Sequence, residues 1–179
     1  LSCGIMKKIL LAVCLLAVLA GCSTFRKDDP LPVAGQINLD RFMGQWHVIA
    51  VVPTILDRSA HNTTKTYERW DRGIKIAYEF EKGEFGGELK SYNTKAVVDN
   101  PGINSDWEVR IVTWPFETDY KILHIEDDYS VAVIGQPSRK YVWIMSRTKT
   151  IDDPVYSDII LYLQDLGYDV GKIRRIPQR

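Results

Sequence analysis

The feature that most constrains the fold is a series of short runs in which apolar and polar residues alternate. In the run at 74–81, Ile74, Ile76, Tyr78 and Phe80 alternate with Lys, Ala and Glu. This period of two is typical of a β-strand with one buried and one solvated face. Turn-forming residues separate one run from the next. Seven further strands are expected at 46–52, 63–70, 88–98, 107–111, 120–125, 130–135 and 141–147.

One segment has instead the period of an amphipathic helix. Asp153 is suited to cap it, Pro154 fits the first helical position, and Gly167 is expected to end it. Apolar residues recur between them at steps of three and four, at Val155, Ile159, Tyr162, Leu163 and Leu166. A short strand is expected to follow at 172–176.

Eight sequential strands and one late helix predict an all-β fold. The expected arrangement is an eight-stranded antiparallel up-and-down barrel with the helix packed against its outside. A closed barrel has no exposed strand edge, and at eight strands its interior can hold one small ligand. A β-sandwich of similar strand count remains an alternative, because hydrophobic period alone does not distinguish the two. A chain of 179 residues, 45% of them hydrophobic, suits one such domain.

The N-terminus has the features of a signal peptide. Lys7 and Lys8 precede an apolar run at 9–20, which is too short to span a hydrocarbon core of about 30 Å comfortably, and small residues follow. Residues 1–5 precede the first Met and are interpreted as upstream translation. We therefore expect removal of residues 1–21, a flexible polar tether at 22–35, and the folded domain at 36–179.

The end of this leader, Leu-Ala-Gly-Cys at 19–22, resembles the bacterial lipobox. The resemblance implies that Cys22 carries acyl chains, such as palmitate, that anchor the mature protein to a membrane. Cys3 and Cys14 precede the cleavage point, so the mature domain lacks the cysteines for a disulfide or a thiolate metal site. An inner-membrane retention signal has Asp at the position of Ser23. Its absence favours attachment to the outer membrane of a Gram-negative envelope, on the periplasmic face. The alternative to a lipobox at 19–22 is a chance signal-peptide cleavage site made of small residues.

Charge and side-chain spacing argue against several other classes of function. Lys plus Arg and Asp plus Glu both number 23, so the protein is not expected to bind nucleic acid. His47, His61 and His124 lack metal-ligand spacing, and no Ser or Cys occurs in a nucleophile motif. We therefore expect no catalytic residues, no metal and no cofactor.

Two stretches resemble motifs of the lipocalin family. Residues 38–46 are similar to the first motif, a short 3₁₀ turn followed by Gly-x-Trp, here Gly44 and Trp46. Residues 141–148 are similar to the third motif, a last barrel strand that ends in Arg, here Arg147. The helix that follows lies where lipocalins have theirs.

A third stretch is similar to the second lipocalin motif as bacterial outer-membrane lipoproteins of the family have it. Residues 125–132 match this pattern, with Tyr129 in place and Glu126 where the family has Asp. A literal Thr-Asp-Tyr at 118–120 is interpreted as a coincidence at the start of a strand. The resemblance covers about residues 36–179 and implies a lipocalin barrel.

The first and third motifs are complementary in physical terms. An Arg at the closed end of a barrel costs several kcal/mol if it is buried without partners. Stacking the guanidinium on an indole returns about 0.5–2 kcal/mol. We therefore expect Arg147 to clasp Trp46, with Gly44 permitting a tight turn, and we assign the motif residues a structural role.

If the barrel is correct, alternation along the strands predicts which side chains line it. The lining is expected to be aromatic and aliphatic, which suits an acyl chain whose head group stays near the open mouth. These residues are Val48, Ala50, Tyr67, Ile76, Tyr78, Trp107, Val109, Tyr141, Trp143 and Met145. The alternative is that the same residues simply fill the barrel as core. Lys65 and Arg69 share a strand face with Tyr67. If that face points inward, basic groups near the mouth hold a carboxylate or phosphate head group. The alternative is a strand face that points towards solvent.

The resemblance implies a lipid-anchored protein that binds, stores or transports a fatty acid or lysophospholipid in envelope maintenance, without covalent chemistry. One alternative is a periplasmic lipid-modifying enzyme, which needs a titratable group inside the barrel, His124 or Tyr67. Another is a structural envelope lipoprotein with a filled barrel. Monomer and homodimer both remain open.

Overall fold

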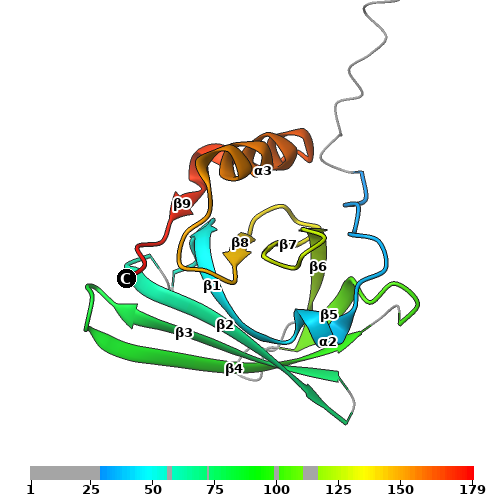
Figure 1. The fold of residues 1–179 in the computed structure, drawn as a ribbon, viewed down its shortest axis with the longest axis horizontal. Coiled ribbons are helices and arrows are strands. Elements are labelled where there is room, and N and C mark those ends of the chain that lie inside the picture. Colours follow the sequence, from blue (N-terminus) through cyan, green and yellow to red (C-terminus); the bar gives the residue numbers. More distant parts are fainter. Residues whose placement is uncertain (1–28, 56–57, 72, 99–100, 111–116) are drawn as a thin grey trace, which may run out of the picture.

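The computed structural model describes residues 29–55, 58–71, 73–98, 101–110 and 117–179. Each strand pairs antiparallel with the next, and β1 pairs with both β8 and β2, so the sheet closes into a barrel. Figure 1 shows the strands arranged as a ring. The strands are β1 (Gly44–Val51), β2 (Ala60–Trp70), β3 (Gly73–Lys82), β4 (Glu88–Val98), β5 (Asp106–Arg110), β6 (Glu117–Ile125), β7 (Val131–Gly135) and β8 (Val142–Ser146). The predicted barrel is confirmed, and the sandwich alternative is wrong.

The strand directions define the two ends of the barrel. The chain enters at α2 (Leu39–Phe42), whose first turn is capped by Asn38 Oδ1, which accepts from the backbone N–H groups of Asp40 and Arg41 at 2.9 and 3.2 Å. We call the end at α2 the closed end. The opposite end, where β3 turns into β4, is the mouth.

The predicted helix is α3 (Asp153–Asp165), and it lies outside the ring of strands (Figure 1). Pro154 lies in its first turn, and Gly167, at φ +84°, follows its end. Ile159 and Leu163 are buried in a cluster with Ile144, which lies on β8. The alternation along the strands therefore separates an outer core under α3 from a core inside the barrel.

A β-bulge overturns one prediction from alternation. The pairing of β1 with β8 shifts register between Val48 and Ala50. Trp46, Val48 and Val51 consequently belong to the core inside the barrel, and Ala50 belongs to the outer core. The predicted lining residue Ala50 is therefore wrong, because one extra residue reverses the faces of the strand beyond it.

The segment that precedes α2 packs along the barrel. The described part of the expected tether, residues 29–35, is held by Arg139 Nη2, which donates to Asp29 O at 2.6 Å, and by Ala34 N–H, which donates to Ile122 O at 2.7 Å. Leu31 is buried in the outer core. The flexible tether is therefore wrong for these residues, because an apolar side chain and backbone hydrogen bonds hold them.

The C-terminal segment fills a gap between β1 and β2. After the 3₁₀ turn η1 (Val170–Lys172), the short strand β9 (Arg174–Arg175) pairs with β1. Gln178 Nε2 then donates to the carbonyls of Val48 and Thr63, at 2.9 and 3.1 Å. The predicted C-terminal strand is confirmed, although it is shorter than 172–176.

Cys22 and the expected leader lie outside the described residues. In the part of the chain that the structure describes, none of the helices has the length and apolar character needed to cross a membrane.

Candidate ligand-binding site in the barrel

Arg147 and Trp46 meet at the closed end of the barrel, as predicted. The guanidinium carbon lies 3.8 Å from the centroid of the Trp46 ring. The same guanidinium donates to the backbone carbonyls of Gln45, Arg41, Phe42 and Met43, at 2.8, 2.6, 3.1 and 2.9 Å respectively. Arg147 thus holds α2 and the start of β1 against the end of β8.

Gly44 permits this arrangement. Its φ is +92°, a conformation that residues with a side chain rarely adopt. A Cβ at this position would lie 3.6 Å from Arg147 Nη1. That distance is an ordinary van der Waals contact, so glycine is required here by the backbone conformation of the turn into β1 and not by the space beside the guanidinium.

The second motif lies against the same corner. Tyr129, at φ +63°, accepts a 2.7 Å hydrogen bond at its Oη from the backbone N–H of Asn38. The Arg41 guanidinium carbon lies 4.1 Å from the centroid of the Tyr129 ring. Glu126 accepts from Tyr129 N–H through its backbone carbonyl, at 2.8 Å, and its carboxylate lies 3.1 Å from His124 Nε2. These contacts fix the 126–130 turn and support a structural role for it.

Four aromatic side chains, which we call the aromatic plug, fill the barrel at its closed end: Phe42, Trp46, Tyr67 and Trp107. All four are fully buried. The Phe42 ring lies at the centre, with centroid distances of 5.2 Å to Trp46, 5.0 Å to Tyr67 and 5.3 Å to Trp107. The plug therefore fills the barrel at its closed end.

A polar layer covers the plug. The Tyr120 ring stacks on Trp107 and on Trp143, at centroid distances of 5.6 and 6.0 Å. Its Oη shares a short hydrogen bond with Tyr67 Oη and accepts from Lys65 Nζ at 3.3 Å. Burial raises the pKa of both tyrosines above the usual value, so both phenols stay neutral at physiological pH.

Comparison with known proteins decides the family. A family model described as a lipocalin-like domain matches residues 37–178. The chain belongs to the lipocalin family. It is 31% identical over 156 residues to temperature-induced lipocalin-1 of Arabidopsis thaliana, with 83% of each chain covered. It is 26% identical over 167 residues to the outer membrane lipoprotein Blc of Escherichia coli K12, with 90% of each covered.

Solved structures show the same fold. Insecticyanin from the tobacco hornworm Manduca sexta superposes with a TM-score of 0.62 at 18% identity, over 83% of this chain and 84% of that one. Apocrustacyanin C2 superposes with a TM-score of 0.62 at 17% identity, over 79% and 80%. As a lipocalin, the protein belongs to a family that generally binds small hydrophobic ligands rather than catalysing reactions.

The structure places most of the predicted lining residues inside the lipocalin barrel. The inward residues are Val48, Tyr67, Ile76, Tyr78, Trp107, Trp143 and Met145. Val109 lies on β5, where the side chain is outside the described part. Tyr141 is wrong, because it precedes β8 and packs against the outer core. Whether the inward residues contact a ligand stays a prediction.

Several important residues of the lipocalin interior were missed. Phe42 belongs to the aromatic plug. Its position between Leu39 and Gly44, in the segment that resembles the first motif, is the signal that could have indicated its burial in the barrel. Tyr120 begins a predicted strand, and its alternation with Ile122 is the signal for an inward side chain. Tyr92, on β4, also packs against the inner core.

Two candidates for interior chemistry lie elsewhere. His124 is on the outer side of the lipocalin barrel, where its ring lies 6.2 Å from that of Tyr162 on α3, because β6 has a register shift between Ile122 and His124. The proposal of His124 as an interior titratable group is therefore wrong. Arg69 is half exposed and pairs with Asp40 at 2.8 Å, so it lies outside the barrel at the closed end.

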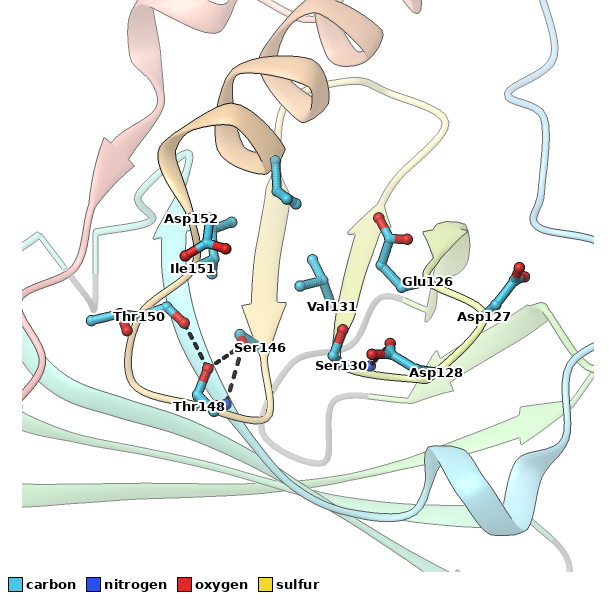
Figure 2. Close-up of a pocket in the computed structure, with 11 residues that line it drawn as sticks. Glu126, Asp127, Asp128, Ser130, Val131, Ser146, Thr148, Thr150, Ile151 and Asp152 are labelled. Carbon is cyan, nitrogen blue, oxygen red and sulfur yellow. Dashed lines mark hydrogen bonds between the residues drawn. The ribbon is translucent and has the colours of Figure 1, made fainter.

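A separate hollow of about 420 Å³ lies outside the lipocalin barrel, between the 126–130 turn and α3 (Figure 2). Four acidic residues, Glu126, Asp127, Asp128 and Asp152, are among those that line it. Within the described ranges, no group of three or more His, Cys, Asp or Glu residues is arranged to hold a metal ion. The internal hydrogen bonds of this hollow, such as Thr148 Oγ1 to Thr150 O at 2.6 Å, fix its loop.

Proposed function

We propose that this lipocalin binds a single-chain lipid, a fatty acid or lysophospholipid, in the mouth half of its barrel and stores or transports it. The observation that carries the proposal is the change of burial along the barrel. The plug is fully buried, whereas the inward rings of Tyr78, Tyr92 and Trp143 are only partly buried. We expect an acyl chain to pack against these aromatic rings.

Burial of such a chain supplies enough free energy for useful affinity. Each CH₂ group removed from water contributes about 0.8 kcal/mol. A chain of about ten buried methylenes thus contributes about 8 kcal/mol, which exceeds the lower estimates of the entropic cost of association, about 4 kcal/mol. The lipid class is supported by the lining and by the family.

We propose that the protein acts at the outer membrane, anchored through lipidated Cys22 and facing the periplasm, in envelope maintenance. The lipobox-like sequence at 19–22 supports the anchor. Relatives named outer membrane lipoprotein Blc, in Escherichia coli and in Vibrio cholerae, support the compartment.

A tryptophan fluorescence titration tests binding. Oleate and oleoyl lysophosphatidylethanolamine are added to the mature protein, and we expect a saturable change with one site per chain. Trp143→Phe should lose most of the signal, since this residue packs against the inner core and is only partly buried. Trp70→Phe is the matched control, because Trp70 lies at the end of β2. A titration without saturable change for either lipid would contradict the proposal.

A further inference from the structure

The segment before α2 begins at the mouth end of the barrel. Asp29 O accepts from Arg139 Nη2 at 2.6 Å, and Arg139 lies in the loop that joins the end of β7 to the start of β8. This loop is at the same end as the β3–β4 turn, because neighbouring strands alternate in direction around the barrel. From Asp29 the segment runs along the outside of the barrel to Asn38, next to α2 at the closed end (Figure 1). The chain that precedes Asp29 therefore joins the domain at its mouth end.

The position of Asp29 limits how the proposed lipid anchor holds the barrel. Seven residue steps separate Cys22 from Asp29, which gives a reach of at most about 25 Å for a fully extended chain. The described segment uses nine steps, from Asp29 to Asn38, to pass from the mouth end to the closed end. If the closed end faced the membrane, the shorter tether would have to retrace that whole length. The tether therefore favours an orientation with the mouth end at the membrane.

Three parts of the chain meet at this end and form what we call the mouth rim. Its described residues are 52–55, 58–59, 82–89 and 136–141. Val52 N–H donates to Val142 O at 3.1 Å, which joins the first part to the start of β8. Gly83 N–H donates to Ser59 O at 2.8 Å, which joins the first part to the β3–β4 turn. Backbone hydrogen bonds thus hold the rim together as one surface.

The mouth rim exposes two large apolar side chains. Ile55 is 83% exposed in the loop after β1, and Leu89 is 64% exposed at the start of β4. They are the two most exposed large hydrophobic side chains among the residues that the structure describes. Contact with water is unfavourable for such side chains, and the boundary between lipid head groups and acyl chains removes it.

Basic side chains accompany the apolar ones on the mouth rim. Each of its three parts exposes one of them: Arg58, Lys82 and Lys140. The described rim also has two glutamates, of which Glu84 is exposed and Glu88 pairs with Lys90 at 2.6 Å. Apolar side chains flanked by Lys and Arg fit a bilayer that contains anionic lipid, because the apolar groups enter the boundary while the basic groups stay at the phosphates.

We propose that the mouth rim docks on the lipid bilayer to which Cys22 is anchored, so that the open end of the barrel faces the membrane. Ile55 and Leu89 then enter the boundary between head groups and acyl chains. A single-chain lipid passes between the bilayer and the barrel without crossing bulk water. The inference rests on the proposed anchor and on the proposed lipid binding, and it adds the surface through which the lipid is exchanged.

Depth-dependent quenching in vesicles tests the orientation. The lipidated protein is reconstituted into vesicles of equal parts phosphatidylethanolamine and phosphatidylglycerol. One new cysteine is labelled with the fluorophore NBD, either Ile55→Cys on the mouth rim or Asp127→Cys, an exposed position in the 126–130 turn at the closed end. We expect spin-labelled acyl chains to quench the Ile55→Cys label at least about threefold more strongly, because an interfacial side chain lies within the head-group and acyl boundary.

Lipid transfer tests the two apolar side chains. The double variant Ile55→Ser, Leu89→Ser should take up oleoyl lysophosphatidylethanolamine from vesicles about 5- to 10-fold more slowly, because it loses apolar contact with the bilayer. The affinity of the same variant for this lipid in solution should not change, since both side chains are exposed. Leu161→Ser is the matched control, because Leu161 is 59% exposed on α3 and lies outside the rim.

The outcomes separate the docking from the proposals on which it rests. Wild-type protein that does not stay with the vesicles refutes the anchor, and the docking with it. Anchored protein whose Asp127→Cys label is quenched as strongly as the Ile55→Cys label refutes the docking alone, and so do equal transfer rates in the double variant and the wild type. If the wild type takes up no lipid, the proposed lipid binding is refuted, and the quenching comparison still decides the orientation.

Discussion

Replacing Arg147 by Met should destabilise the protein by about 3 kcal/mol without weakening lipid binding. Of the four carbonyls that Arg147 contacts, those of Arg41 and Gln45 are exposed, so water replaces the lost donor at little cost. The bonds to Phe42 and Met43 are partly buried and contribute about 1 kcal/mol each. The cation–π contact with the Trp46 ring adds about 1 kcal/mol.

Urea unfolding followed by circular dichroism measures this loss. We expect a lower midpoint with an unchanged slope, because the variant exposes the same surface when it unfolds. Arg69→Met is the control, since its ion pair with Asp40 is exposed and such pairs contribute at most about 1 kcal/mol. A loss below about 1 kcal/mol in Arg147→Met would refute the reasoning, and so would a loss of oleate binding in the folded variant, because Arg147 would then belong to the ligand site.

Two further predictions concern the buried tyrosines and the anchor. Burial raises the pKa of Tyr67 and Tyr120 in the folded protein, so the unfolded chain releases these protons at lower pH. The free energy of unfolding should therefore fall as pH rises above about 10. Absorbance at 295 nm should show both phenols ionising only on unfolding, and ionisation in the folded protein would contradict their burial. Cys22→Ala should abolish incorporation of labelled palmitate, and labelling that persists would place the lipid elsewhere.

The barrel could be predicted from the sequence because alternation and turn residues act locally along each strand. The Trp46–Arg147 contact followed from the motif resemblance together with the cost of an unpaired charge. Both depend on short segments whose physical preferences agree with the fold.

The errors have a common physical origin in long-range geometry. Single-residue bulges in β1 and β6 reversed the faces expected for Ala50 and His124, and no local pattern announces them. The packing of Leu31 depends on an outer core that α3 helps to form, more than a hundred residues later. The burial of Lys65 depends on closure of the barrel, which no local pattern along β2 reports.

Native mass spectrometry of the full-length protein, gently extracted from membranes of the cells that make it, tests the central claim most directly. We predict one bound lipid per chain, and extraction should identify it as a single-chain lipid with an acidic group. A protein that is found only without lipid, and that stays so after incubation with oleate and with oleoyl lysophosphatidate, would show a filled barrel and contradict the account.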